Sequence, residues 1–236
     1  MSPDAPILEV GNLEKSFGGL KALNGVSFDL HPGEILGLAG PNGSGKTTCI
    51  NAITGVFRID GGSIRFAGED IHHRATYRRV RKGINRTFQV PRPFPGLTVH
   101  ENVLVAAHYG SGEHADAMTL LEDTGLAEFA DKPARTLNSS QQKMLGLARA
   151  LATKPRLLLV DEIGAGLNPE ELSAMAQRLR GYANQGMALL VVEHLMDFLD
   201  QVTDRLVVMD AGNTLFTGKL AQATEDPRVI EAFLGG

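Results

Sequence analysis

One run of nine residues has the composition and spacing of a phosphate-binding loop. Its inner glycines, Gly43 and Gly45, allow backbone angles that turn successive N–H groups toward an anion. Lys46 adds a positive charge that can reach terminal phosphates, and the Thr47 hydroxyl can bind Mg²⁺. We therefore expect a nucleotide and Mg²⁺ to bind at Gly40, Pro41, Asn42, Gly43, Ser44, Gly45, Lys46, Thr47 and Thr48.

Two carboxylates mark a second candidate site. Asp161 and Glu162 directly follow the apolar residues 157–160, and a buried carboxylate is costly unless it meets a cation. Beside a phosphate-binding loop, Asp161 is placed to hold the metal and Glu162 to polarise an attacking water. Gln89 could contact the metal or the water. His194 follows another apolar run and is expected to face the phosphate side of the sheet.

The phosphate-binding loop has the flanking elements that its motif requires. Residues 34–39 are an apolar run of strand length, and residues 47–54 are expected to form a helix that Gly55 ends. That helix directs its positive N-terminal end at the same phosphates. A glycine-rich turn that fits the motif by chance is the weaker interpretation, because strand, loop and helix agree.

The rest of the chain predicts an α/β protein. Residues 7–30 and 63–67 alternate apolar and polar side chains between glycine turns, which favours an N-terminal antiparallel β region. The middle, residues 99–153, has helical periodicity. The last third indicates a mostly parallel sheet with packed helices. Its strands are expected at 157–160, 188–192 and 206–209, and its helices at 170–183 and 194–201.

Composition limits the classes of function. With 236 residues, 43% of them hydrophobic, the chain suits one large domain or two small ones tightly joined, with an ordinary core. Its net charge of -4 does not favour nucleic acid as a partner. No apolar run approaches the roughly 20 residues that span a bilayer, and the first residues do not resemble a signal peptide.

Two smaller features carry expectations about burial. The single cysteine, Cys49, excludes an internal disulfide and is expected to be a small buried side chain. A local basic cluster is interpreted as a solvated helix face rather than a binding patch. It comprises Arg74, Arg78, Arg79, Arg81, Lys82 and Arg86.

Taken in order, these motifs resemble the ATP-binding subunit of ABC transporters over nearly the whole chain. The six matching elements are the loop 40–48, Gln89, a signature segment at 137–142, residues 157–162, the loop 164–169 and His194. The resemblance implies a P-loop NTPase core with an inserted helical subdomain. It divides a single ATP-binding domain, 1–236, into a core at 1–88 and 154–236 and a helical subdomain at 89–153.

The resemblance also implies roles for individual residues. Phe17 is similar to the aromatic residue that stacks on adenine, and His194 to the switch histidine that contacts the terminal phosphate. The catalytic residues would be Lys46, Glu162 and His194, and the metal ligands Thr47, Gln89 and Asp161. The ATP of an opposite subunit would meet Asn138, Ser139, Ser140 and Gln141.

The implied cofactors and partners follow from the same resemblance. The cofactors are ATP and Mg²⁺. The partners are integral membrane permease subunits, whose coupling helix would enter a groove of the helical subdomain, and a second ATP-binding subunit in a homo- or heterodimer. An extracytoplasmic solute-binding protein would act indirectly. The implied location is peripheral, on the cytoplasmic face of the cell membrane.

A closer likeness is to the branched-chain amino-acid uptake subfamily, in segments at 17–23, 86–89, 97–105, 165–169, 193–196 and 204–212. It implies that the chain powers uptake of branched-chain amino acids or similar small polar solutes. A soluble ABC-type ATPase is the first alternative, although its usual coiled-coil insertions or duplicated halves are missing here. A phosphate-loop kinase or GTPase is the second alternative: a kinase would need an acceptor pocket, and a GTPase an Asn-Lys-x-Asp tetrapeptide, which the sequence lacks. A nucleotide-responsive regulator with feeble hydrolysis stays open.

The signature segment departs from the family pattern. The family has Leu-Ser-Gly-Gly-Gln, and this chain has Leu-Asn-Ser-Ser-Gln at 137–141. Asn and Ser still make good helix N-caps, but each added Cβ crowds an approaching phosphate. We therefore expect slow hydrolysis at the site that this segment completes, so that glycine at Ser139 and Ser140 would raise ATP turnover. Ile163, in place of the usual proline, is a milder departure.

Overall fold

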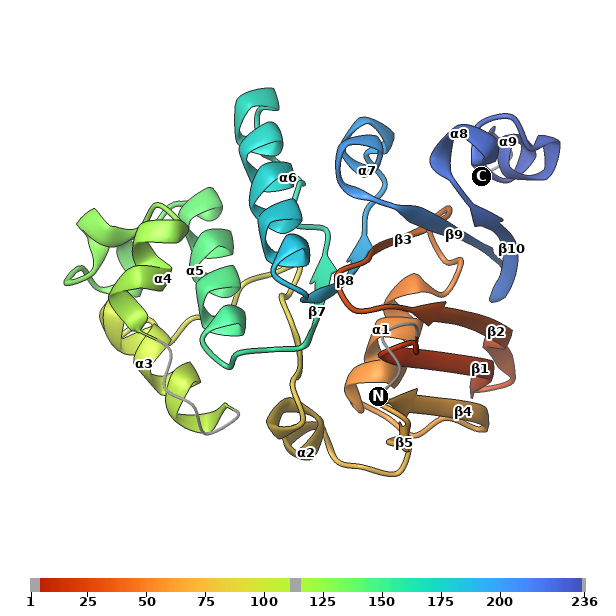
Figure 1. Ribbon diagram of the computed structural model, residues 1–236, viewed down its shortest axis with the longest axis horizontal. Coiled ribbons are helices and arrows are strands. Elements are labelled where there is room, and N and C mark those ends of the chain that lie inside the picture. The colour runs from red at the N-terminus through yellow and green to blue at the C-terminus, as the bar shows by residue number, and fades with distance from the viewer. Residues whose placement is uncertain (1–4, 111–115, 235–236) are drawn as a thin grey trace.

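Two β-sheets and a lobe of helices make up the computed structural model, which describes residues 5–110 and 116–234 (Figure 1). The larger sheet has six strands in the order β10-β9-β3-β8-β7-β6, and only the β10–β9 pair is antiparallel. This confirms the predicted mostly parallel sheet and its three predicted late strands. Its strands are β3 (Ile35–Ala39), β6 (Ile84–Arg86), β7 (Leu157–Asp161), β8 (Ala188–Val192), β9 (Arg205–Asp210) and β10 (Asn213–Gly218).

The smaller sheet confirms the predicted antiparallel region. Its order is β2-β1-β4-β5, and every pair is antiparallel. The helix α1 (Lys46–Thr54) lies between the two sheets and buries Cys49, as expected. Most of the N-terminal stretch weighed as a signal peptide lies outside the described residues. The strands are β1 (Leu8–Phe17), β2 (Leu20–Leu30), β4 (Gly61–Phe66) and β5 (Glu69–Asp70).

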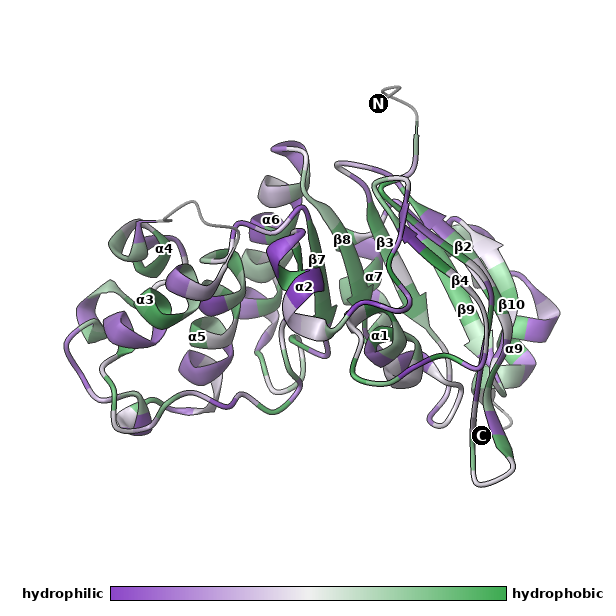
Figure 2. Ribbon diagram, turned by 90° about the horizontal axis from the view of Figure 1, so that it is seen from below, coloured by the Kyte–Doolittle hydropathy of each residue, from purple (hydrophilic) through white to green (hydrophobic). Residues whose placement is uncertain are grey.

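Helices cover the opposite face of the larger sheet, so its strands β3, β7 and β8 are buried on both sides. In β8, Leu190 and Val192 belong to the core around α1, whereas Leu189 and Val191 belong to the outer core. This explains the continuous apolar strand sequences, which Figure 2 shows in green. The outer core is completed by α6 (Pro169–Asn184), α7 (Met196–Val202), α8 (Leu220–Ala223) and α9 (Pro227–Leu234).

The predicted helix at 194–201 begins later than expected. Its observed start is Met196, so His194 lies in the connection between β8 and α7. Since no side chain caps the N-terminus of α7, the sequence has no local signal that would mark this boundary. The other late helix, predicted at 170–183, is confirmed as α6 and gains one residue at each end.

The helical lobe has a hydrophobic core of its own. A capping box of Thr98 and Glu101 starts α3. The lobe contains α3 (Val99–Tyr109), α4 (Ala117–Asp123), α5 (Ser139–Leu151) and the 3₁₀ turns Ala127–Phe129 and Ala134–Thr136. These elements lie within the predicted subdomain at 89–153, whose exact limits stay a prediction. No helix in the described part of the chain is long and apolar enough to cross a membrane.

The basic cluster was interpreted wrongly at two of its members. Arg78 and Arg81 of α2 (Thr76–Arg81) are exposed, as predicted, but Arg79 is only 2% exposed and Arg86 also turns inward. The C-terminal carbonyls of α1 need donors, and a guanidinium supplies five N–H groups. Arg79 donates to the carbonyl oxygens of Ala52, Ile53, His72 and Arg74.

Candidate functional site

The loop between β3 and α1 has the backbone of an anion-binding site. Gly43 and Gly45 have φ of 80° and 106°, in a region that residues with a Cβ rarely adopt. Gly45 is the N-cap of α1, and no side chain caps that end. The first N–H groups of the helix therefore stay available to a ligand. A Cβ on Gly45 would lie 2.5 Å from the carbonyl oxygen of Ala22, so packing also requires glycine there.

Lys46 is folded into this loop. The residue is 8% exposed, and its Nζ donates to the carbonyl oxygens of Gly40 at 2.7 Å and Pro41 at 2.9 Å. Burial lowers the pKa of Lys46, and the carboxylates of Glu162 and Asp161 partly oppose this. A phosphate in the loop would offer this cation charged acceptors, which form stronger hydrogen bonds than carbonyls do.

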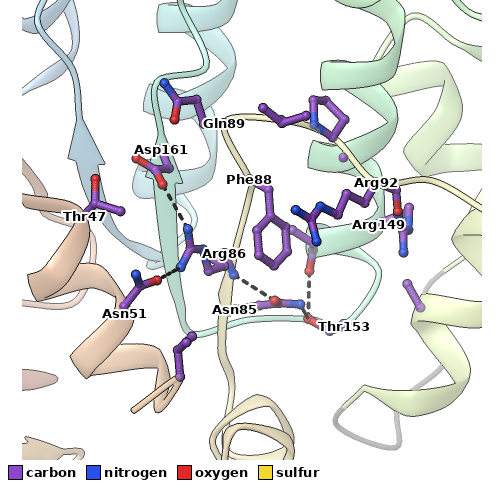
Figure 3. A pocket seen from close by; sticks show the side chains of 16 residues that line it. Thr47, Asn51, Asn85, Arg86, Phe88, Gln89, Arg92, Arg149, Thr153 and Asp161 are labelled. Atoms are coloured by element: carbon purple, nitrogen blue, oxygen red, sulfur yellow. Dashed lines mark hydrogen bonds and ion pairs between the residues drawn. The ribbon is translucent and has the colours of Figure 1, made fainter. Parts of the chain in front are cut away.

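Asp161 ends β7 as a buried carboxylate, 5% exposed. Its Oδ2 accepts a hydrogen bond from Nη2 of Arg86 at 3.0 Å, and its backbone N–H donates to the Thr87 hydroxyl at 3.1 Å. Burial raises the pKa of Asp161, whereas the charge of Arg86 lowers it. The same guanidinium donates from Nη1 to Oδ1 of Asn51 at 2.6 Å, so Arg86 joins β6, β7 and α1 (Figure 3).

The three residues predicted as metal ligands line one cavity. Thr47, Gln89 and Asp161 border a volume of ≈ 570 Å³ (Figure 3). Their hydroxyl, amide and carboxylate oxygens are the hard donors that suit Mg²⁺, which usually takes one or two carboxylates and completes its shell with phosphates and water. In residues 5–110 and 116–234, no cluster of three or more His, Cys, Asp or Glu could hold a metal alone. The oxygen donors of Thr47, Gln89 and Asp161 fit a Mg²⁺ ion that also binds a phosphate.

Glu162 has an unusual backbone. Its φ is 46°, which costs a residue with a Cβ about 1–3 kcal/mol and is found most often at functional sites. Its N–H donates to the carbonyl oxygen of Val192 at 2.9 Å, and its Oε2 accepts from Nε2 of Gln89 at 2.5 Å. The bend turns Glu162 away from the strand direction of Asp161, and Gln89 holds its carboxylate.

The loop 162–165 is bound from two other sides. From α5, Nζ of Lys143 donates to three carbonyl oxygens, those of Glu162 at 3.4 Å, Ile163 at 3.3 Å and Ala165. From the end of β8, the fully buried Glu193 accepts the N–H of Gly164 at 2.6 Å. Burial raises the pKa of Glu193 and lowers that of Lys143, whose charge is supported by Glu193 and Glu162. These opposite charges hold the loop that carries Glu162.

Two predicted ligand residues lie outside this network. The His194 side chain is 56% exposed, and its Nδ1 lies 4.0 Å from Oε2 of Glu193. Phe17 is 47% exposed and packs edge-on against Phe57, with ring centroids 5.3 Å apart. Neither forms a hydrogen bond or a ring contact with the phosphate-binding loop among the described residues, so their roles toward nucleotide stay predictions.

The signature segment begins α5. Asn138 is the N-cap: its Oδ1 accepts the N–H of Gln141 at 2.9 Å, and Oε1 of Gln141 accepts the N–H of Asn138 at 3.0 Å. Ser139 and Ser140 are the first two helical residues, and neither has a positive φ. The backbone therefore does not require glycine at these positions. The first N–H groups of a helix lack partners within it, so this end can still meet an anion.

Five residues whose side chains take part in the network were not predicted as parts of the site: Asn51, Arg86, Thr87, Lys143 and Glu193. Glu193 had a usable signal, because it follows an apolar strand directly, as Asp161 does. Arg86 lies three residues before Gln89 but was counted with the solvated cluster. Asn51 also had a signal, because it lies four residues after Thr47 in the predicted helix and so shares a face with it. Lys143 meets the site only through the packing of a distant segment.

Comparison with known proteins places this geometry in a family. Residues 23–165 match the family described as "ABC transporter". The chain is 39% identical to the high-affinity branched-chain amino acid transport ATP-binding protein BraF of Pseudomonas aeruginosa, over 98% of each chain. It is 37% identical to the corresponding Escherichia coli protein LivG, again over 98% of each. A crystal structure titled as a nucleotide-free ATP-binding cassette from an ABC transporter has a TM-score of 0.89 at 31% identity, covering 98% of this chain and 100% of that one.

Proposed function

The chain belongs to the ABC transporter family of ATP-binding proteins, and we propose that it powers uptake of branched-chain amino acids or similar small polar solutes. One structural observation supports this most directly. The phosphate-binding loop, the buried Asp161 and the bent Glu162 converge beside one cavity. Relatives that align over nearly the full chain are named as branched-chain amino acid transport ATP-binding proteins, which supports the choice of solute.

In this proposal the residues of the site position ATP and water. Lys46 exchanges the carbonyls of its own loop for phosphate oxygens. Thr47, Gln89 and Asp161 would hold Mg²⁺, which would supply positive charge to the phosphates. Glu162 polarises the attacking water, and Gln89 keeps its carboxylate in place. The largest contribution is positioning and preorganised charge, because little covalent chemistry is required of the protein.

A second ATP-binding subunit would complete the site. The open N-terminus of α5, at Asn138 to Gln141, would meet the phosphates of ATP held by that second chain. His194 would contact the terminal phosphate, and Phe17 would stack on adenine. Closure of two such chains would move their helical lobes together, and hydrolysis would let them separate.

The permease subunits would bind where apolar side chains surround the cavity. Val56, Phe88 and Val90 line it and are 59%, 55% and 68% exposed. Contiguous exposed apolar groups of this kind mark interaction sites. We place the chain on the cytoplasmic face of the membrane as a peripheral subunit. A solute-binding protein would act on it only through the permease.

Solute uptake in cells tests the proposal. A strain that lacks this chain but keeps its membrane partners should take up radiolabelled leucine only when wild-type chain is restored. Lys46→Ala should not restore uptake, because the loop loses its cation, while the membrane partners still co-purify with the variant. Uptake of leucine and related solutes that is equal with and without the chain would reject transport and favour a regulatory role.

A further inference from the structure

Arg86 lines the cavity and contacts Asp161, and the proposed mechanism gives it no role. It ends β6 with a side chain only 10% exposed, and it donates to Asp161 from Nη2 and to Asn51 from Nη1 (Figure 3). Its Nε donates to the carbonyl oxygen of Thr87 at 3.2 Å. Three elements thus fix the guanidinium on the carboxylate that the mechanism assigns to Mg²⁺.

Separating the charges of Arg86 and Asp161 costs free energy. Asp161 is 6% exposed in its side chain, and a buried ion that loses its partner carries a large desolvation cost. The other nearby cation, Lys46, is engaged by carbonyl oxygens of its own loop. Arg86 is therefore the cation that balances Asp161 before a metal arrives. Mg²⁺ at the same carboxylate would repel the guanidinium, since two cations then share one anion.

The other face of the guanidinium is in contact with the apolar side of the cavity. The Arg86 guanidinium carbon lies 4.7 Å from the centroid of the Phe88 ring, a stacking distance for arginine on an aromatic face. Phe88 is 55% exposed and lines the cavity beside Val90. In the segment 86–89, Arg86 contacts the carboxylate of Asp161 and Gln89 that of Glu162. The exposed Phe88 ring lies between them in sequence, where a segment bound at the cavity would touch it.

We propose that Arg86 is a positioning residue that competes with Mg²⁺ for Asp161, and that contact at Phe88 adjusts this competition. Without metal, the guanidinium keeps Asp161 paired and in place. When Mg²⁺ binds with ATP, Arg86 gives up its contact with Asp161 and keeps its contacts with Asn51 and the Phe88 ring. A permease segment that covers Phe88 changes the support of Arg86 and so changes the affinity for Mg²⁺. Both parts take Asp161 as the Mg²⁺ ligand of the proposed function, and the second part also takes the permease partner from it.

The isolated full chain allows a direct test. The measured quantity is the Mg²⁺ concentration that gives half-maximal binding of a fluorescent ATP analogue, together with the thermal unfolding midpoint in EDTA. Arg86→Met should lower the half-maximal Mg²⁺ concentration by about tenfold, because the competing cation is gone, and should lower the midpoint in EDTA. Arg92→Met is the matched control: Arg92 lines the same cavity but does not contact Asp161, and both values should match wild type.

The remaining outcomes are equally decisive. If Arg86→Met and wild type need the same Mg²⁺, competition is wrong. If Arg86→Met does not fold, Arg86→Lys replaces it, because lysine keeps the charge but lacks the fixed fork that reaches both Asn51 and Asp161; it should shift the Mg²⁺ requirement in the same direction. Phe88→Ala should change the half-maximal Mg²⁺ concentration less than Arg86→Met does. No change would overturn the proposal that contact at Phe88 adjusts the competition. Wild-type chain that binds no ATP analogue at any Mg²⁺ concentration would instead reject the ATP site itself.

Discussion

The candidate site has two ends, the carboxylates of Asp161 and Glu162 and the N-terminus of α5, and these are held in different ways. Around Asp161 and Glu162, side chains from α1, α5, β6 and the end of β8 meet in one network. At the start of α5, Asn138 and Gln141 bond each other, and Nε2 of Gln142 donates to the carbonyl oxygen of Leu137, so the described side-chain bonds of this segment stay within it. The first end is organised inside the chain, whereas the second presents helix N–H groups outward.

This difference indicates what each end is for. Catalysis gains most from groups that are already oriented when charge develops, which suits the braced carboxylates. An exposed helix N-terminus costs nothing to leave open in water and can receive an anion, which suits a surface that meets the ATP of a second chain. Substitutions should therefore affect chemistry strongly at the first end and weakly at the second.

Among the substitutions that test this comparison, Glu162→Gln is expected to have the largest effect. Loss of the carboxylate should lower ATP turnover by about 10²–10³-fold, because the water loses its base. ATP binding should persist, since Lys46 and the loop are intact. Turnover and nucleotide affinity of the assembled transporter check both statements. Glu225→Gln, at an exposed site far from the cavity, serves as the control, and a Glu162→Gln variant with normal turnover would remove this residue from the mechanism.

Arg79→Met tests the hydrogen bonds that Arg79 donates to the C-terminus of α1, the helix that carries Thr47 and Asn51. The substitution removes donors from four carbonyl oxygens, two of them at the C-terminus of α1. We expect the free energy of unfolding to fall by about 3 kcal/mol, since buried carbonyls would be left without partners. Urea denaturation measures this. Arg78→Met, one residue earlier and exposed, should change stability by less than about 0.5 kcal/mol, and equal effects would contradict the assignment.

Lys143→Met tests the contact between the two ends, because Lys143 belongs to α5 but binds the loop of Glu162. We expect kcat to fall by about tenfold, about 1.4 kcal/mol, with KM for ATP nearly unchanged. The loop would lose three of its hydrogen bonds while the phosphate-binding loop keeps its own. Lys143→Arg should recover part of the rate. A change in KM alone, or equal losses in Lys132→Met at an exposed site, would exclude a positioning role.

The sequence predicted those features that depend on neighbouring residues. The strand before the phosphate-binding loop, the apolar strand that ends in Asp161, the apolar strand that ends two residues before His194, and the antiparallel start all follow from short patterns with a local cause. The structure confirms these strands, and it places Thr47, Gln89 and Asp161 on one cavity.

What the sequence could not supply depends on distant packing. Arg79 and Arg86 were read as solvated because neighbouring arginines in sequence suggest a charged face. In the fold, Arg79 meets the end of α1, and Arg86 meets a carboxylate 75 residues away. Glu162, with its left-handed backbone, likewise donates its N–H to Val192 on the neighbouring strand. A single sequence carries no local trace of such partners.

The smallest expected effect lies at the open end. Replacing Ser139 and Ser140 by glycine should raise turnover of the assembled transporter by about threefold, less than 1 kcal/mol. The gain arises because two Cβ atoms leave the path of an approaching phosphate, while the backbone there is already helical and needs no glycine. Glycine also weakens the helix slightly, so Ser139→Ala with Ser140→Ala is the control: it removes both hydroxyls but keeps both Cβ atoms and should give no gain. Unchanged turnover in the glycine variant would mean that this segment does not limit hydrolysis. The open end of the site would then differ from the other in its hydrogen bonds, but the serines would have no effect on the rate.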